Sequence, residues 1–279
     1  MTSGLAAPAA ATLGECDPSA AMAPSARTYL DALAIVLDRI EKTQGEAIER
    51  AARSCARAIG AGRFVHVFGT GHSRVVAEEM WPRFGSYPGF HPIIELSVGV
   101  WPSVTGANGQ RQAMFLENVS GLAGSILRNF SVTSEDVLLA VSSSGTNVVT
   151  GELAELMKAL GLTVIALTAV DHSTHCTPKL ASGRRLHEIA DLVLDTCTPV
   201  GDAAVDVDGI KYRVGPTTTV AACAIANALK VRTAELLAME GVTVRALPHS
   251  ALVDGAEVAT AFDEAYDEHA RRTAVLQRW

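Results

Sequence analysis

Residues 136–161, DVLLAVSSSGTNVVTGELAELMKALG, contain an apolar run, a polar loop and a helical pattern in direct succession. The run at 136–141 is typical of a buried β-strand. Residues 148–160 have the length and apolar spacing of a helix, which is expected to end at Gly161 because glycine is a common helix stop. This order indicates one unit of a parallel sheet, since parallel strands need a helical crossover between them.

The same alternation continues toward both ends of the chain. The other expected strands are 63–68, 90–96, 162–167 and 191–194. The other expected helices are 29–57, 74–80, 111–130, 217–239 and 256–276. Alternating strands and helices predict the α/β class, with right-handed crossovers and a parallel sheet that helices cover on both faces.

The composition limits the classes of partner. The chain has 279 residues and a net charge of -7, from 23 Lys+Arg and 30 Asp+Glu. An acidic chain without a basic run is poorly suited to nucleic acid, whose phosphate backbone calls for basic surfaces. No stretch of ~18 apolar residues occurs, so we expect no membrane partner. Hydrophobic residues make up 48% but aromatic ones only 5%, which favours closely packed helices rich in alanine.

The N-terminus and the cysteines bear on localisation. The segment MTSGLAAPAAATLGEC lacks the basic region and leucine-rich core of a signal peptide, so we expect a flexible tail over 1–24. The five cysteines are scattered and form no CxxC pair, which predicts free thiols in a reducing cytoplasm and no zinc site. No flavin, nicotinamide or metal motif is present, and we expect no cofactor.

Two polar loops carry the chemistry. The loops 69–73 (GTGHS) and 142–147 (SSSGTN) each follow an expected strand and precede a helix, where ligands of α/β sheets bind. Free N–H groups and the helix dipole favour an anion such as phosphate there. The alternative is simple helix capping, but one cap needs one hydroxyl and the second loop has four. Neither loop matches a Walker motif, GxGxxG or a nucleophile elbow.

The pairing of FGTGHS (68–73) with AVSSSGTN (140–147) resembles the sugar isomerase (SIS) domain. The resemblance implies a three-layer sandwich with a five-stranded parallel sheet, phosphosugar binding at the strand ends, and a homodimer with a shared active site. We accordingly expect N-terminal helices over 25–62, an SIS domain over 63–241 and a C-terminal helical extension over 242–279.

Four further segments narrow the resemblance. They are GHSRVVAEEMWPRFG (71–85), SGRRLHEIADLVLD (182–195), PVGDA (199–203) and VGPTTTV (214–220). They resemble a stand-alone SIS subfamily and, within it, the N-acetylglucosamine-6-phosphate dehydratase type. The implied enzyme is a carbon–oxygen lyase that abstracts the C2 proton and expels the C3 hydroxyl. Alternatives that share the phosphosugar site are an ether-cleaving lyase, an aldose–ketose isomerase and a non-catalytic sensor.

The resemblance also assigns the binding loops. It implies that Ser142, Ser143, Ser144 and Thr146 hold the phosphate, while Thr70 and Ser73 face the sugar or the phosphate. The whole expected substrate-binding set is Gly69, Thr70, Gly71, Ser73, Ser142, Ser143, Ser144, Gly145, Thr146 and Asn147.

Three residues are candidates for proton transfer, which a lyase and an isomerase both require. The segment AEEM (77–80) resembles the AEEL of heptose-phosphate isomerases, and this resemblance assigns Glu79 as the base. The stretch from Ser73 to Glu79 is about one helical turn shorter than in those isomerases. The alternative is that Glu79 is an exposed glutamate on a helix. His72 lies in the loop over 69–73. It is a candidate acid/base group, and the alternative is a residue that stabilises the loop. Asp202 follows the last expected strand. It is a candidate acid for the departing group, and the alternative is a turn residue after Gly201. Glu117 is a further candidate, and His172 is expected at the pocket wall.

Overall fold

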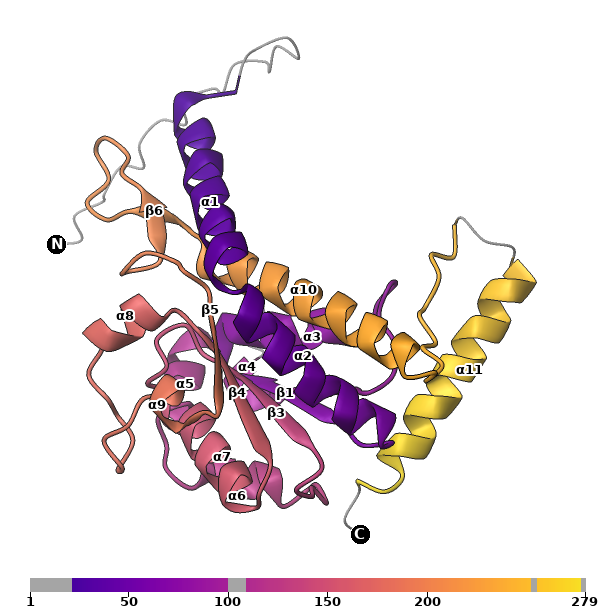
Figure 1. Ribbon diagram of the computed structural model, residues 1–279. Helices are drawn as coiled ribbons and strands as arrows, with labels where there is room; N and C mark the ends of the chain where they lie inside the picture. The colour runs from indigo at the N-terminus through magenta and orange to yellow at the C-terminus, as the bar shows by residue number, and fades with distance from the viewer. Residues whose placement is uncertain (1–21, 100–108, 252–254, 277–279) are drawn as a thin grey trace, which may run out of the picture.

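The computed structural model describes residues 22–99, 109–251 and 255–276. At its centre lies a five-stranded sheet in the order β2-β1-β3-β4-β5, with every neighbouring pair parallel (Figure 1). The strands are β1 (Val65–Gly69), β2 (Phe90–Ile93), β3 (Val137–Val141), β4 (Thr163–Thr168) and β5 (Leu192–Asp195). This arrangement confirms the expected three-layer α/β fold with flanking helices.

The central strand shows why both faces are covered. Successive strand side chains point to opposite faces. Val137, Leu139 and Val141 of β3 belong to one buried apolar cluster, whereas Leu138 and Ala140 belong to the other. A strand that is apolar on both faces is stable only between two helical layers.

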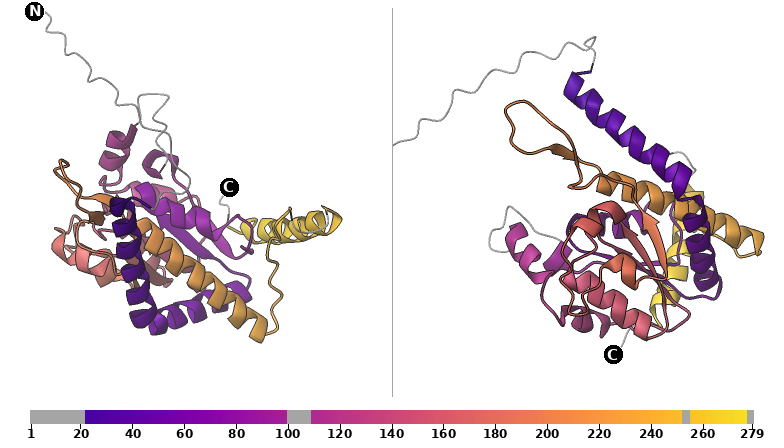
Figure 2. Two further views of the ribbon diagram at one scale, coloured as in Figure 1. Left: turned by 90° about the horizontal axis from the view of Figure 1, so that it is seen from above. Right: turned by 60° about the vertical axis from the view of Figure 1, so that its left-hand side comes forward.

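Helices from different parts of the chain make the two layers. The larger cluster contains side chains of α1 (Pro24–Thr43), α2 (Gly45–Gly60), α3 (Val75–Met80), α10 (Thr218–Met239) and α11 (Gly255–Thr273). The opposite cluster contains side chains of α6 (Leu122–Leu127), α7 (Val148–Ala159) and α9 (Leu186–Ile189). The N-terminal part of α1 projects beyond the sheet, and α11 lies at the other side of the molecule (Figure 2).

The alanine content serves the packing of α2 against α10, which lie side by side (Figure 1). Ala51, Ala52 and Ala56 of α2 are buried, as are Ala222 and Ala226 of α10. Helix axes approach more closely when the side chains between them are small. The small-residue composition is therefore used in the layer that covers one face of the sheet.

Several expected helices are divided. The region 29–57 forms α1 and α2, which separate at Gln44, whose side-chain oxygen accepts the N–H of Asp195 at 2.9 Å. The region 111–130 forms α5 (Gly109–Leu116) and α6, interrupted by Gly121 at φ 89°. These breaks follow from tertiary contacts and backbone geometry that helical periodicity does not report.

The remaining elements are short. They are η1 (Gly71–Arg74), α4 (Leu96–Gly99), α8 (Val170–His175) and the antiparallel hairpin of β6 (Ala203–Val205) and β7 (Val214–Pro216). The expected tail over 1–24 lies outside the described residues up to position 21, and the division at 25, 63 and 242 stays a prediction. No helix in the described ranges is long and apolar enough to cross a membrane.

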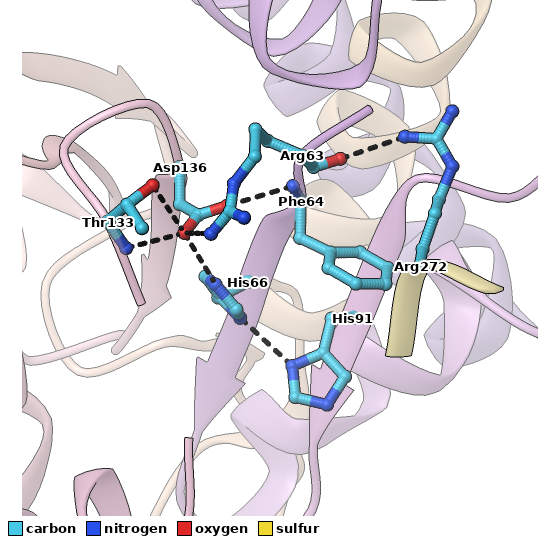
Figure 3. A network of polar contacts seen from close by, with 7 residues as sticks. All are labelled: Arg63, Phe64, His66, His91, Thr133, Asp136 and Arg272. Atoms are coloured by element: carbon cyan, nitrogen blue, oxygen red, sulfur yellow. Dashed lines mark hydrogen bonds and ion pairs between the residues drawn. The ribbon is translucent and has the colours of Figure 1, made fainter. Parts of the chain in front are cut away.

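A buried ionic cluster joins the starts of β1 and β3 (Figure 3). The Arg63 guanidinium donates to both oxygens of Asp136, at 3.1 and 2.6 Å. The same carboxylate accepts the backbone N–H groups of Phe64 at 3.0 Å and Thr133 at 2.7 Å. Burial alone would raise the pKa of Asp136, but these donors and the nearby His66 ring hold its pKa well below the usual range.

Histidines extend this cluster. Nδ1 of His66 lies 2.9 Å from Nδ1 of His91, so one of the two rings donates and the other accepts. Burial lowers the pKa of His91 to about 3, and the neighbouring His66 and His269 act in the same direction. The folded protein therefore keeps His91 neutral. Arg272 of α11 donates to the carbonyl oxygen of Arg63 at 3.0 Å, which attaches the C-terminal helix to the same place (Figure 3).

Replacing Asp136 with asparagine should destabilise the fold. D136N leaves the Arg63 guanidinium, whose side chain is only 17% exposed, without its counter-charge. Breaking a buried ion pair in this way costs about 3 kcal/mol or more of unfolding free energy, measurable by urea denaturation. The matched control is D38N, which removes the exposed Asp38–Lys42 pair and should barely move the midpoint. Equal midpoints for D136N and the wild type would contradict this role.

The free energy of unfolding should also fall in acid. The pKa of His91 is about 3 in the folded protein and 6.5 ordinarily. Between these two pH values, His91 is protonated in the unfolded chain but neutral in the folded one. Stability therefore decreases as the pH falls from about 6.5 toward 3, by up to about 1.4 kcal/mol per pH unit. Asp136 adds to the loss below about pH 4. H91Q should flatten the upper part of this slope in denaturation curves; an unchanged slope would exclude a neutral His91.

Candidate functional site

A cavity of about 340 Å³ opens at the carboxyl ends of the strands. Parallel strands end at one edge of the sheet, so the segments after β1, β3, β4 and β5 meet there. Its walls are Thr70, Gly71, His72, Ser73, Val76, Gln110, Ala113, Met114, Glu117, Val141, Ser142, Ser143, Ser144, Asn147, Leu167, His172, Thr196, Asp202, Thr218, Thr219 and Ala222. The two loops singled out in the sequence therefore face one space.

The loop over 142–147, hereafter the serine loop, is held in shape by hydrogen bonds of its own side chains. Ser142 Oγ accepts the N–H of Gly145 at 3.1 Å, and Ser144 Oγ donates to Asn147 Oδ1 at 3.1 Å. Gly145 has φ 63°, and a Cβ there would meet Ser173 Oγ at 2.6 Å, so both backbone geometry and space require glycine. Asn147 occupies the N-cap position of α7 without a side-chain cap hydrogen bond. Its amide serves the loop instead, which weakens the interpretation of this segment as a simple cap.

A hydrogen-bonded chain brings a carboxylate to this loop. Asn147 Nδ2 donates to Thr70 Oγ1 at 3.2 Å, and Thr70 Oγ1 donates to Glu117 Oε2 at 2.8 Å. The backbone carbonyl of Glu117 also accepts the N–H of Val149, in the first turn of α7, at 3.0 Å. Glu117 is thus fixed at both its main chain and its side chain, beside the serine loop.

A second chain of hydroxyl groups forms the opposite wall. Ser143 Oγ donates to Thr218 Oγ1 at 3.3 Å, and Thr218 contacts Thr198, which in turn contacts Thr196, at 3.1 and 3.0 Å. The three threonines are buried. This network connects the serine loop to the end of β5 and to the first turn of α10, so that the cavity walls form one hydrogen-bonded unit.

Asp202 lines the cavity but is engaged at the start of α10. Its Oδ1 accepts the N–H of Thr217 at 2.9 Å, the N–H of Thr218 at 2.7 Å and the hydroxyl of Thr218 at 2.6 Å. All three contacts use this oxygen as an acceptor, so the carboxyl group satisfies donors at the start of the helix. The role of Asp202 as a proton donor stays a prediction, and these contacts do not favour it.

Glu79 lies outside this cavity. Its Oε1 accepts Asn227 Nδ2 of α10 at 2.7 Å, and its other oxygen pairs with Arg83. Burial alone would raise the pKa of Glu79, but these two partners outweigh it and lower the pKa. Glu79 lines a separate cavity of about 490 Å³, together with Phe84 and Tyr266. In the described chain Glu79 is therefore not brought together with the serine loop.

The other expected residues divide in the same way. Those that line the cavity are Thr70, Gly71, His72, Ser73, Ser142, Ser143, Ser144, Asn147 and Asp202. The remaining three, Gly69, Gly145 and Thr146, do not line the cavity but support the loops. A Cβ at Gly69 would meet Ser73 at 2.8 Å, and the buried Thr146 contacts Ser144 at 3.1 Å. No group of three His, Cys, Asp or Glu side chains within the described ranges could hold a metal ion.

Two residues that were minor candidates in the sequence line the cavity. Glu117 stood as one helix glutamate among several, because its partner Thr70 is 47 positions away. His172 was expected at the pocket wall, and it does line the cavity. One feature of the sequence could have indicated each residue. His172 closely follows an expected strand, and Glu117 lies in a segment between two strands where no clear periodic pattern is present.

Comparisons with known proteins bear on the family and the fold. A model of the SIS domain matches residues 28–169. A UPF0309 protein of Halalkalibacterium halodurans is 34% identical over 238 residues, covering 85% of this chain and 94% of that protein. A UPF0309 protein of Streptomyces griseus is 31% identical over 230 residues, covering 81% and 88%.

A phosphoheptose isomerase structure from Francisella tularensis has a TM-score of 0.50 at 17% identity, covering 75% of this chain and 96% of that one. At this identity the likeness shows the fold alone, and it agrees with the parallel sheet described above. The SIS match spans half of the chain, and the identity to the two relatives extends over most of it. The chain therefore belongs to the SIS domain family, together with the UPF0309 proteins.

Proposed function

We propose that this protein is a phosphosugar lyase that dehydrates N-acetylglucosamine 6-phosphate. The observation that carries the proposal is the position of Glu117, hydrogen-bonded through Thr70 and Asn147 to a serine loop at the start of α7. One cavity thus combines an anion cradle with a carboxylate that can accept a proton. The choice of dehydration among the reactions of such a site rests on the sequence resemblance to the stand-alone dehydratase type.

The serine loop suits a phosphate group. It presents hydroxyl groups and the start of a helix of 12 residues, where the dipole and free N–H groups favour an anion. The described cavity wall contains no lysine or arginine. Hydroxyl donors and the helix end would therefore bind the phosphate, and this explains how an acidic chain can take an anionic ligand.

Glu117 suits the base. In the ring-opened sugar, the C2 proton is acidic because it neighbours the C1 aldehyde. Glu117 would take this proton, the C3–O bond would break, and the departing oxygen would take up a proton and leave as water. The product is a 2-acetamido-2,3-unsaturated aldehyde 6-phosphate. Among the described residues Glu117 Oε2 has one hydrogen-bond partner, Thr70, and no partner is found for Oε1.

An aldose–ketose isomerase is the second candidate, because the same carboxylate could return the proton to C1 instead. A sensor without chemistry would need the serine loop but not Glu117. The three functions differ in the fate of the phosphosugar: loss of one water from a 2-acetamido sugar, conversion of an aldose with a C2 hydroxyl into a ketose of equal mass, or binding alone.

We also propose a homodimer in a reducing cytoplasm. The exposed side of α10 includes Val220 and Val231, at 42% and 68% exposure, and no charged residue precedes Lys230 in this helix. Such an apolar helix side suits a second copy of the chain. The cysteines in the described ranges are Cys55, Cys176, Cys197 and Cys223, all free thiols, which fits a reducing compartment.

Incubation with N-acetylglucosamine 6-phosphate should yield a product lighter by one water that absorbs in the ultraviolet. E117Q should lower turnover by roughly 100- to 10,000-fold, the usual contribution of a general base, while substrate still binds in calorimetry. E79Q should retain turnover, because Glu79 faces α10 and not this cavity. The reverse pattern, with E79Q inactive and E117Q active, would restore Glu79 as the base. Recovery of all the sugar phosphate at unchanged mass would exclude dehydration.

S144A should weaken binding of the phosphorylated sugar. A hydrogen bond to a charged group contributes about 1.5–3 kcal/mol, so we expect Kd to rise roughly 10- to 150-fold. Binding of unphosphorylated N-acetylglucosamine should change little. The matched control is S120A, since Ser120 contacts Glu152 outside the cavity. Equal losses for both sugars would show that Ser144 does not contact the phosphate.

A further inference from the structure

The face of α5 that lines the cavity carries both polar and apolar side chains. Gln110, Ala113, Met114 and Glu117 line the cavity, and their spacing of three and four positions is that of one helix face. Glu117 directly follows α5 and continues its last turn, because its N–H donates to the carbonyl oxygen of Ala113 at 2.9 Å. The carboxylate proposed to take the C2 proton therefore has two apolar neighbours, Ala113 and Met114, one turn earlier on the same face.

Met114 is the exposed member of this pair. It is 55% exposed, although it lines a cavity whose other side chains include many hydroxyl, amide, imidazole and carboxyl groups. The other apolar side chains of the described wall are at most 3% exposed: Val76, Ala113, Val141, Leu167 and Ala222. Met114 therefore offers apolar surface that an apolar group of a ligand can cover, and removing such surface from water is favourable.

We propose that Met114 and Ala113 form a subsite for the N-acetyl group of the substrate, an inference that rests on the dehydration proposed above. Glu117 would take the proton of C2, and the acetamido nitrogen is bonded to this same carbon. The methyl group of a trans acetamide lies about 3.8 Å from that carbon, because the group has the geometry of a peptide unit. Side chains three and four positions apart on a helix are about 5–6 Å apart at Cβ. With C2 at the Glu117 carboxylate, the acetyl methyl group is within reach of both apolar side chains.

This subsite would select among the groups that a phosphosugar can carry at C2. An acetyl methyl group against Met114 removes apolar surface of both partners from water. A C2 hydroxyl in the same place would lose hydrogen bonds to water and find no partner on this side chain. An aldose–ketose isomerase needs a hydroxyl at C2, because the ketose carbonyl forms from it. Met114 beside the base therefore supports a 2-acetamido sugar as the substrate class, independently of the sequence resemblance.

Unreactive analogues test the subsite without the chemistry. Reduction of N-acetylglucosamine 6-phosphate gives an open-chain alditol that keeps the phosphate and acetamido groups. It has no aldehyde, so its C2 proton is not acidic and it cannot be dehydrated by this route. Glucitol 6-phosphate is the matched ligand with a hydroxyl at C2. In calorimetry, the wild-type protein should bind the acetamido alditol more tightly than glucitol 6-phosphate.

M114A should reduce this preference. We expect the Kd of the acetamido alditol to rise roughly 4-fold or more, the effect of exposing one buried methylene group, while the Kd of glucitol 6-phosphate stays nearly the same. The shorter side chain also leaves room, so the N-butanoyl alditol should gain affinity relative to the N-acetyl one. The control is F115A, since Phe115 is the next residue of α5, is 70% exposed and lies outside the cavity.

Binding of glucitol 6-phosphate reports that the variant is folded. Met114 belongs to neither buried apolar cluster, so M114A should fold. If M114A does not bind glucitol 6-phosphate, M114Q, whose side chain has a similar length but is polar, takes its place in the same assays.

Equal wild-type affinity for the two alditols would overturn the subsite, as would a Kd change in M114A that is the same for both. Loss of water is measured separately on the unreduced sugar phosphate, so these results leave the proposed dehydration standing. Conversely, a wild-type protein that prefers the acetamido alditol through Met114 but never removes water would keep the subsite and contradict the dehydration. The two failures are therefore distinguishable.

Discussion

All five strands run in the same direction, and this constraint gives the two edges of the sheet different roles. At the carboxyl edge, loops from separate parts of the chain meet around one cavity. At the amino edge, the Arg63–Asp136 pair joins the starts of β1 and β3, with Arg272 of the last helix attached to it (Figure 3). This ionic cluster therefore lies at the opposite edge of the sheet from the cavity that is proposed to bind the ligand.

The carboxyl edge is organised by hydrogen bonds between loops. Thr70 after β1 and Asn147 after β3 connect Glu117 to the serine loop, and Thr218 connects the same loop to α10. Each residue of these chains positions another, as active sites need when a proton acceptor must be held within reach of one carbon atom. The proposed chemistry requires a proton acceptor at the cavity, and Glu117 lines it with its side chain held by Thr70.

The sequence predicted the parts of the molecule that depend on local patterns. The strand over 136–141, the loop over 142–147 and the following helix are all present, because apolar runs, hydroxyl residues and Gly161 act within a few positions of one another. It did not predict that Glu79 lies outside the cavity. Helical periodicity shows that a glutamate such as Glu79 lies on a helix, but not that the facing helix offers it Asn227 and so turns it away from the strand ends.

The separation of Glu79 from the cavity makes the account specific, because the sequence resemblance and the structure favour different carboxylates. A crystal structure with N-acetylglucosamine 6-phosphate bound tests this most directly. The account predicts that the phosphate contacts Ser144 and the start of α7, with C2 of the sugar within reach of Glu117. A phosphate bound elsewhere, or a C2 atom that faces Glu79 and not Glu117, would contradict it.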